Sequence, residues 1–149
     1  MKWAWTPNVD WDGRHALAPY YPGDAYVDWL GLDGYNQTWT GWNWFHHLFV
    51  RSMAELGSLN SKDPVVIAET SSSEATAAQA AVGETKAAWI TDAFNHGIPS
   101  FRRIQAVVWF NQDKSREEGC ACDWRIESSP AAAAAIATAL AAHTHVSAP

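Results

Sequence analysis

Residues 64–71, PVVIAETS, combine a short apolar, β-branched run with a single carboxylate, Glu69, near its end. An apolar run without alternation is typical of a strand that is covered on both faces, because neither face then meets water. In barrels of parallel strands, catalytic residues come from the carboxyl ends of the strands. The segment therefore predicts a buried parallel strand that carries Glu69 to the rim of an active site. The alternative is that Glu69 is a solvated loop residue or the N-cap of the next helix.

The regions on either side predict three more strands and three helices. The predicted strands are the apolar runs at 2–6, 26–32 and 104–110. The predicted helices are 45–56, with one apolar face and a stop at Gly57, then 84–95, and then 131–142 after Ser129-Pro130. The order strand, strand, helix, strand, helix, strand, helix implies right-handed βαβ crossovers and a parallel sheet. The segment 143–149 is expected to be a frayed tail.

The size and charge of the chain narrow the possible classes. Its 149 residues suffice for one domain but fall short of the ~250 residues of a complete eight-stranded α/β barrel. The pattern by itself favours either a small open α/β domain or part of a larger one. A formal net charge of -6 without a basic run argues against nucleic acid as a partner. No apolar run reaches membrane-spanning length and residues 1–7 contain no apolar signal segment, so neither a membrane partner nor a signal peptide is expected.

Ten tryptophans set the composition apart, and many stand beside Gly, Asn, Asp and Thr in predicted loops. An indole in a polar loop more often serves as a flat contact surface than as core filler. Cys120 and Cys122 are too few for a disulfide framework and lack the spaced partners of a zinc site, so free thiols or a local bridge are expected. His46 and His47 are expected at the surface or in packing contacts. No metal or cofactor is predicted.

Polar and aromatic side chains follow two of the predicted strands. Asp33, Tyr35 and Asn36 come after the second predicted strand, and Trp109 and Asn111 stand at the end of the last one. Because the carboxyl ends of parallel strands share one edge of a sheet, these residues are expected at a common rim. For Tyr35 the alternative is a phenol that caps the core, and for Trp109 it is a core position.

Five motifs together resemble a known family. They are YPGD at 21–24, VDWLGLDGYN at 27–36, AET at 68–70, VVWFN at 107–111 and DWRI at 123–126. Each is weak alone, but their order and spacing resemble the C-terminal half of the catalytic domain of glycoside hydrolase family 26. Members of that family are (β/α)8 barrels that cleave β-linked polysaccharides with retention of configuration. Most act on β-mannan as mannan endo-1,4-β-mannosidases, and others act on mixed-linkage β-glucan or xylan.

The resemblance covers nearly the whole chain and implies both its fold and its site. The implied fold class is α/β, an incomplete (β/α)8 TIM barrel with strands five to eight and their helices, in a single unit 1–149. Glu69 matches the nucleophile of the seventh strand, and Tyr35 matches the tyrosine that hydrogen-bonds and positions it. Asp33 matches the acid of the same Asp-x-Tyr element. Trp109 matches the tryptophan that forms a platform under the sugar at the cleavage point.

Three further residues are expected to contact substrate because of their chemistry. Asn36 and Asn111 carry amides of the kind that hydrogen-bond sugar hydroxyl groups. Trp39 stands in a predicted loop, where an indole can line an outer subsite. The expected partner is therefore a β-linked polysaccharide or oligosaccharide.

One part of the family pattern has no counterpart here. The general acid/base of the family is a Glu at the end of the fourth strand, and no segment of the chain corresponds to strands one to four. The expectation is a fragment of a retaining endo-β-glycanase that carries the nucleophile and is inactive alone. The alternatives are a non-catalytic carbohydrate-binding half-barrel and an incomplete gene model with no independent activity. Unpaired sheet edges predict a homodimer, and the resemblance implies an extracellular full-length enzyme.

Overall fold

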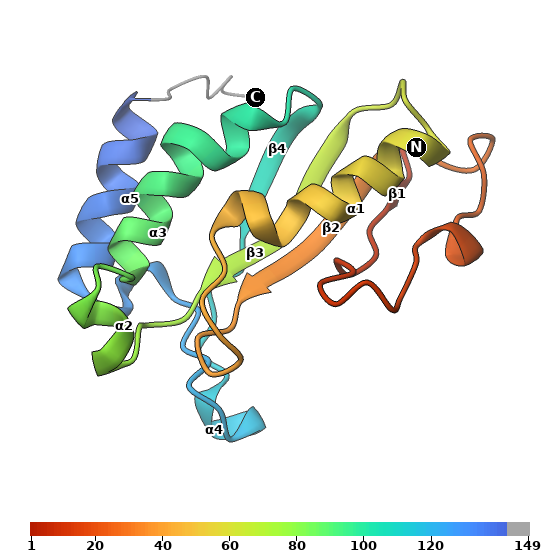
Figure 1. Ribbon diagram of the computed structural model, residues 1–149. Helices are drawn as coiled ribbons and strands as arrows, with labels where there is room; N and C mark the ends of the chain where they lie inside the picture. Colours follow the sequence, from red (N-terminus) through yellow and green to blue (C-terminus); the bar gives the residue numbers. More distant parts are fainter. Residues whose placement is uncertain (143–149) are drawn as a thin grey trace.

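The structure, a computed structural model, describes residues 1–142 and contains one parallel sheet with helices packed against it (Figure 1). The strands are β1 (Ala4–Trp5), β2 (Trp29–Asn36), β3 (Val65–Ser72) and β4 (Ile104–Trp109). The α-helices are α1 (Phe45–Leu59), α2 (Ala77–Ala81), α3 (Lys86–Asp92), α4 (Ser115–Glu118) and α5 (Pro130–Ala142). Short helical turns are η1 (Ala18–Tyr20), η2 (Ala93–Gly97), η3 (Ile98–Ser100) and η4 (Ile126–Ser128), of which η2 is a π-helical turn. The tail predicted at 143–149 lies outside the described residues.

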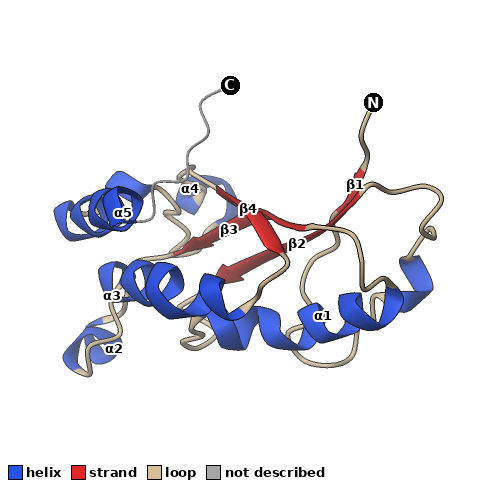
Figure 2. Cartoon of the chain, turned by 90° about the horizontal axis from the view of Figure 1, so that it is seen from above, coloured by secondary structure: helices blue, strands red, loops and turns tan. Residues whose placement is uncertain are grey.

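The sheet has the order β1-β2-β3-β4, and every neighbouring pair is parallel. This confirms the α/β class and the parallel sheet expected from alternating strands and helices. In Figure 2, α1 and α3 run along one side of the sheet. Within residues 1–142, no helix is long and apolar enough to cross a membrane.

The core lies between the sheet and α1 and α3. Leu30 and Leu32 of β2 are fully buried, as are Val65 and Ile67 of β3. From the helices, the buried side chains of the same core include Phe45 and Phe49 of α1 and Trp89 and Ile90 of α3. Because strand side chains alternate between faces, the residues between these apolar ones face the other side of the sheet.

Two strands reach further than their apolar residues indicate. β2 starts three residues after the predicted start at 26 and continues through 33–36, which were expected to follow the strand. The reason is that these polar residues stay in the backbone ladder, with Asn36 still paired to Ser72. Glu69 likewise lies inside β3, and the N-cap of α2 is Thr76. Both alternatives for Glu69, a loop residue or a helix cap, are therefore wrong.

The helix boundaries also differ from prediction in two places. Gly57 does not end α1, which continues to Leu59. The predicted helix 84–95 is α3 followed by the π-helical turn η2, and a separate helix, α2, precedes it. α5 begins at Pro130, where proline suits the first helical position.

Two glycines in this layer offer a matched test of the packing. A Cβ at Gly97 in η2 lies 2.9 Å from Phe45, so Gly97→Ala forces a buried ring to move and is expected to cost about 1–3 kcal/mol. Gly57 in α1 has no neighbour within 4 Å of its Cβ position, so Gly57→Ala is expected to stabilise by about 1 kcal/mol through helix propensity. Urea denaturation measures both, and a change of the same sign in both variants contradicts this packing.

Candidate active site

A bulge in β3 brings the acidic residues of two strands to one face of the sheet. Leu32 pairs with Ile67, but the next pair is Asp33 with Glu69, so β3 holds one extra residue at this point. Strict alternation from Ile67 places residue 69 on the helix-covered face. The extra residue reverses this, and Glu69 shares the opposite face with Asp33.

Tyr35 extends the same row on β2 and contacts the carboxylate directly. Its hydroxyl donates a hydrogen bond to Oε2 of Glu69. Burial raises the pKa of the Tyr35 phenol well above its usual range, and the hydrogen bond to Glu69 adds to the rise. The phenol therefore remains protonated and acts as a fixed donor that orients the carboxylate.

Aromatic rings hold the Tyr35 phenol in place. The ring centroid lies 4.9 Å from that of Trp124 and 5.8 Å, edge to face, from that of Phe110. Trp39 lies against the same indole at 5.7 Å and is 43% exposed, so it presents a ring surface to solvent beside the site. Trp124 itself is buried. Offset and edge contacts of this kind stabilise by about 0.5–1.5 kcal/mol each beyond the area that they bury.

Asp33 has one carboxylate oxygen without a partner. Its Oδ1 atom is buried and accepts no hydrogen bond from the part of the chain that the structure describes. Burial raises the pKa of Asp33 to about 6, and the negative charge of Glu69 adds to the rise. A buried, unbonded carboxylate oxygen is unfavourable, so this atom has a strong tendency to accept a hydrogen bond from a ligand.

Trp109 packs against other side chains of the protein, which a free platform for a sugar ring would not do. It pairs with Thr70, which is buried on the helix-covered side, and its ring meets that of Trp89 at 5.9 Å. Its indole N–H donates to the carbonyl of Trp124 at 2.8 Å. The structure thus packs Trp109 between Trp89 and the loop that carries Trp124, and the residue as a whole is partly buried.

Asn36 and Asn111 use both ends of their amides within the chain. Asn36 is fully buried; its Nδ2 donates to Ser72 Oγ and its Oδ1 accepts from the backbone of Asn43, both at 2.9 Å. Asn111 donates to Glu127 at 3.2 Å and accepts from a backbone N–H, that of residue 126, at 2.6 Å. The structure does not bring these two amides to the row formed by Asp33, Tyr35 and Glu69.

Comparison with known proteins identifies the family. The model of the family described as Glycosyl hydrolase family 26 matches residues 1–99 of the 149-residue chain. The chain belongs to glycosyl hydrolase family 26. It is also 38% identical over 148 residues to the protein named Endoglucanase H of Acetivibrio thermocellus. That alignment covers 95% of this chain and 15% of the relative.

The family-matched segment contains Asp33, Tyr35 and Glu69. The resemblance inferred from motifs is therefore confirmed at the level of the family.

A buried lysine supports the loop between β4 and α5, and the sequence pattern did not indicate it. Lys86 is fully buried, and its ammonium donates to the carbonyls of Asp123 at 3.1 Å and Arg125 at 2.6 Å, and to Ser128 Oγ at 2.9 Å. Burial lowers the pKa of Lys86 to about 8, and neighbouring carboxylates partly oppose this. A Lys at the first position of a helix usually points to solvent, so only the fold reveals its position.

The same loop contains an ion pair and a disulfide. Arg125 pairs with Asp123 at 2.7 Å, and the two groups form two parallel hydrogen bonds. Cys120 and Cys122 are joined to each other, which selects the local bridge over free thiols. Within residues 1–142 there is no unpaired cysteine.

The two adjacent histidines of α1 lie as expected, one in a packing contact and one at the surface. The ring of His46 stacks on Phe101 at 5.0 Å, and its Nδ1 lies 2.9 Å from Ser100 Oγ. His47 is exposed.

The Asp33 carboxyl predicts a specific dependence of stability on pH. The folded protein retains the Asp33 proton up to about pH 6, whereas the usual value is 3.8, so stability from this group is lost as pH rises from 3.8 to 6. Asp33→Asn is expected to reduce this loss and to raise the free energy of unfolding at pH 7. Urea denaturation at intervals from about pH 4 to pH 7 measures the effect.

Asp28 provides the control with the opposite sign. The hydrogen bond from Lys2 lowers the pKa of Asp28, so its contribution to stability is present above its usual pKa and is lost as pH falls. Asp28→Asn is therefore expected to lower stability at pH 7. Equal effects of the two substitutions contradict the assignment of Asp33 as a poorly solvated acid.

Proposed function

We propose that this chain is part of a retaining endo-β-glycanase in which Glu69 is the nucleophile. The observation that carries the proposal is the hydrogen bond from Tyr35 to Glu69, which fixes one carboxylate at the carboxyl end of a parallel sheet. Family membership supports the reaction class, and the name of the relative, an endoglucanase, supports a β-linked glucan as substrate. β-Mannan remains in the proposed substrate class because the family resemblance implies it. The full-length enzyme acts outside the cell in this proposal.

The reaction proceeds by two displacements at the anomeric carbon. An oxygen of Glu69 forms a bond to that carbon while the glycosidic C–O bond breaks, and a second carboxylic acid gives its proton to the leaving oxygen. Water then attacks the same carbon and gives a proton to the second carboxylate, and the Glu69 carboxylate is released. Tyr35 holds the Glu69 carboxylate in place, which reduces the orientational freedom that the reaction has to overcome.

The second carboxyl group comes from outside this chain in our proposal. Retaining enzymes place the two carboxyl groups about 5–5.5 Å apart, and the family supplies the acid from the fourth strand. We assign β1 to β4 to strands five to eight of the barrel, which puts the acid/base on a strand next to β1. Asp33 lies beside Glu69 on the paired strand and binds substrate in this scheme instead of protonating it.

Substrate contacts come from the rim. Trp39, which is 43% exposed, supplies ring surface against the apolar face of a pyranose. Trp109, a partly buried residue, stays in the proposal as the platform that the family resemblance implies. The unbonded Oδ1 of Asp33 accepts a hydrogen bond from a sugar hydroxyl. Asn36 and Asn111 support loops around the site, because both ends of each amide are already bonded within the chain.

Substitution of the nucleophile tests the function in a protein that contains the complete barrel. Glu69→Ala is expected to reduce turnover of β-glucan or β-mannan by about 10⁴-fold or more while tetrasaccharide binding persists. Glu117→Ala, at an exposed position of α4, is the control and is expected to retain activity. Reducing-sugar release and calorimetry measure the two properties. Near-parental turnover in Glu69→Ala rejects Glu69 as the nucleophile.

The 149-residue chain alone is expected to hydrolyse polysaccharide only slowly. A positioned general acid typically contributes about 10²–10⁴-fold, and the proposal places that acid outside the chain. Reducing-sugar assays of the purified chain measure this. Rapid release shows that the acid lies within residues 1–149, and Asp33→Asn, Glu74→Gln and Asp113→Asn then identify it.

We propose that the isolated chain associates with further copies of itself through its unpaired sheet edges. β1 and β4 each have one side without a paired strand among residues 1–142, and Trp3 and Val108 are 62% and 52% exposed. Unpaired edges of this kind promote association, so the isolated chain is expected to form a homodimer or larger species. Sedimentation at micromolar concentration tests this, and a monodisperse monomer with a sharp cooperative melt contradicts it.

A further inference from the structure

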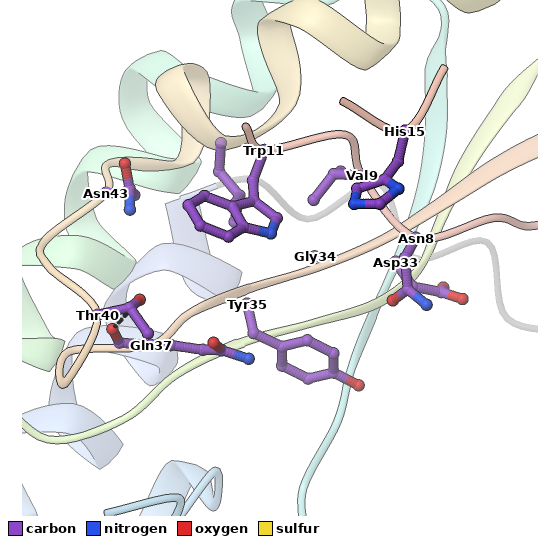
Figure 3. Close-up of a pocket in the computed structure, with 11 residues that line it drawn as sticks. Asn8, Val9, Trp11, His15, Asp33, Gly34, Tyr35, Gln37, Thr40 and Asn43 are labelled. Atoms are coloured by element: carbon purple, nitrogen blue, oxygen red, sulfur yellow. Dashed lines mark hydrogen bonds between the residues drawn. The ribbon is translucent and has the colours of Figure 1, made fainter. Parts of the chain in front are cut away.

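A pocket next to Asp33 and Tyr35 is lined by several polar side chains that make no hydrogen bond within residues 1–142. It lies between the segment after β1 and the loop that follows β2, and it has a volume of about 340 Å³. Figure 3 shows it running along β2, from Asn8 and His15 at one end to Asn43 at the other. Its volume is at the lower end of the ~300–1,000 Å³ range of sites for small ligands.

Four polar side chains of this pocket make no hydrogen bond within the described part of the chain, whereas Tyr35 and Thr40 are bonded to Glu69 and to the carbonyl of Gln37. Asn8, His15, Gln37 and Asn43 line it, and none of the four side chains makes a hydrogen bond to another described residue. Asp33 also lines the pocket, and its buried Oδ1 atom accepts no hydrogen bond from the described residues. Amides and an imidazole both donate and accept hydrogen bonds, which suits a ligand whose groups do the same.

An indole lies among these polar groups. Trp11 lines the pocket with 73% of its surface exposed, and Figure 3 shows its ring beside the polar side chains. Neither Lys nor Arg is among the lining residues, so the pocket lacks the cations that an anionic ligand requires. A flat apolar ring surrounded by uncharged donors and acceptors matches a neutral sugar, which has apolar faces and many hydroxyl groups.

The segment that carries Trp11 is anchored on both sides. The backbone N–H of Asp10 donates to Ser52 Oγ of α1 at 2.9 Å in a buried contact. Further along, Glu55 of α1 accepts from the backbone of Leu17 at 2.8 Å and from the next residue at 2.9 Å. The pocket wall is therefore built onto α1, which reduces the cost of ordering it when a ligand binds.

From these observations we infer that the pocket lined by Trp11, Asn8, Gln37 and Asn43 is a binding subsite for a sugar unit of the β-glycan chain. Asp33 and Tyr35 are among the residues that line this pocket and also belong to the row that contains Glu69, so the proposal places the bound unit next to the one that reacts. This inference rests on the proposed function. It adds a specific surface, outside the Tyr35–Glu69 pair, that increases affinity for longer oligosaccharides.

Calorimetric titration with cellotetraose and with mannotetraose tests the subsite. The titrated protein contains the complete barrel and carries Glu69→Gln, which stops turnover. Trp11→Ala is expected to weaken binding of the preferred tetrasaccharide about tenfold, the effect of losing one stacking contact with its hydrogen bonds. Gln37→Ala tests the polar wall without removing a ring and is expected to weaken binding in the same direction. Tyr20→Ala removes an aromatic residue that is 74% exposed and outside the pocket, and it is expected to bind as the parent does.

Trp39→Ala distinguishes a failure of the subsite from a failure of the proposed function. If it weakens binding while Trp11→Ala and Gln37→Ala bind with parental affinity, the subsite is rejected and the proposed function stands. If the parent binds neither tetrasaccharide, the proposed function fails and the subsite fails with it. Weaker binding in both Trp11→Ala and Gln37→Ala, with Tyr20→Ala unchanged, supports the subsite.

Discussion

The parallel pairing of β2 with β3, with its one-residue bulge at Leu32 and Asp33, is the constraint on which the site depends. Before the bulge, alternation directs Leu30, Leu32 and their partners into the core under α1. After it, the same strands present Asp33 and Glu69 to the opposite face. Because side chains alternate with a period of two, a single extra residue is enough to convert a core strand into one that carries a carboxylate outward.

Contacts beyond the strands then limit the movement of that carboxylate. Tyr35 bonds to Glu69, Trp124 packs on Tyr35, and the carbonyl of Trp124 accepts from both Trp109 and Ser71. Lys86 fixes the backbone on either side of Trp124 through the carbonyls of residues 123 and 125. Removal of this ammonium takes the donor from three partly buried acceptors, so the loop and the site share one network.

The parts of the fold that could be predicted from the sequence are those that leave a hydrophobic pattern. Four strands and the parallel sheet followed from apolar runs and their alternation with helices, and the family followed from short motifs in the right order. The bulge was not predictable, because Ala68 is apolar and fits the same run whether or not it is the extra residue. The burial of Lys86 was not predictable either, since its three hydrogen-bond partners lie 37 to 42 residues away in the sequence. The aromatic and polar segment from 8 to 15 shows no period at all, so the Trp11 pocket appears only when α1 anchors it.

The central claim is that the carboxylate held by Tyr35 attacks the anomeric carbon, and covalent trapping tests it most directly. A 2-fluoro-substituted β-glycoside with a highly activated leaving group needs no general acid for the first displacement and accumulates as a glycosyl-enzyme. Mass spectrometry of peptides from the trapped protein then locates the sugar. The account predicts one sugar attached at Glu69, no label in Glu69→Gln and slower labelling in Tyr35→Phe. A label on another carboxylate, or equal labelling of the parent and Glu69→Gln, contradicts it.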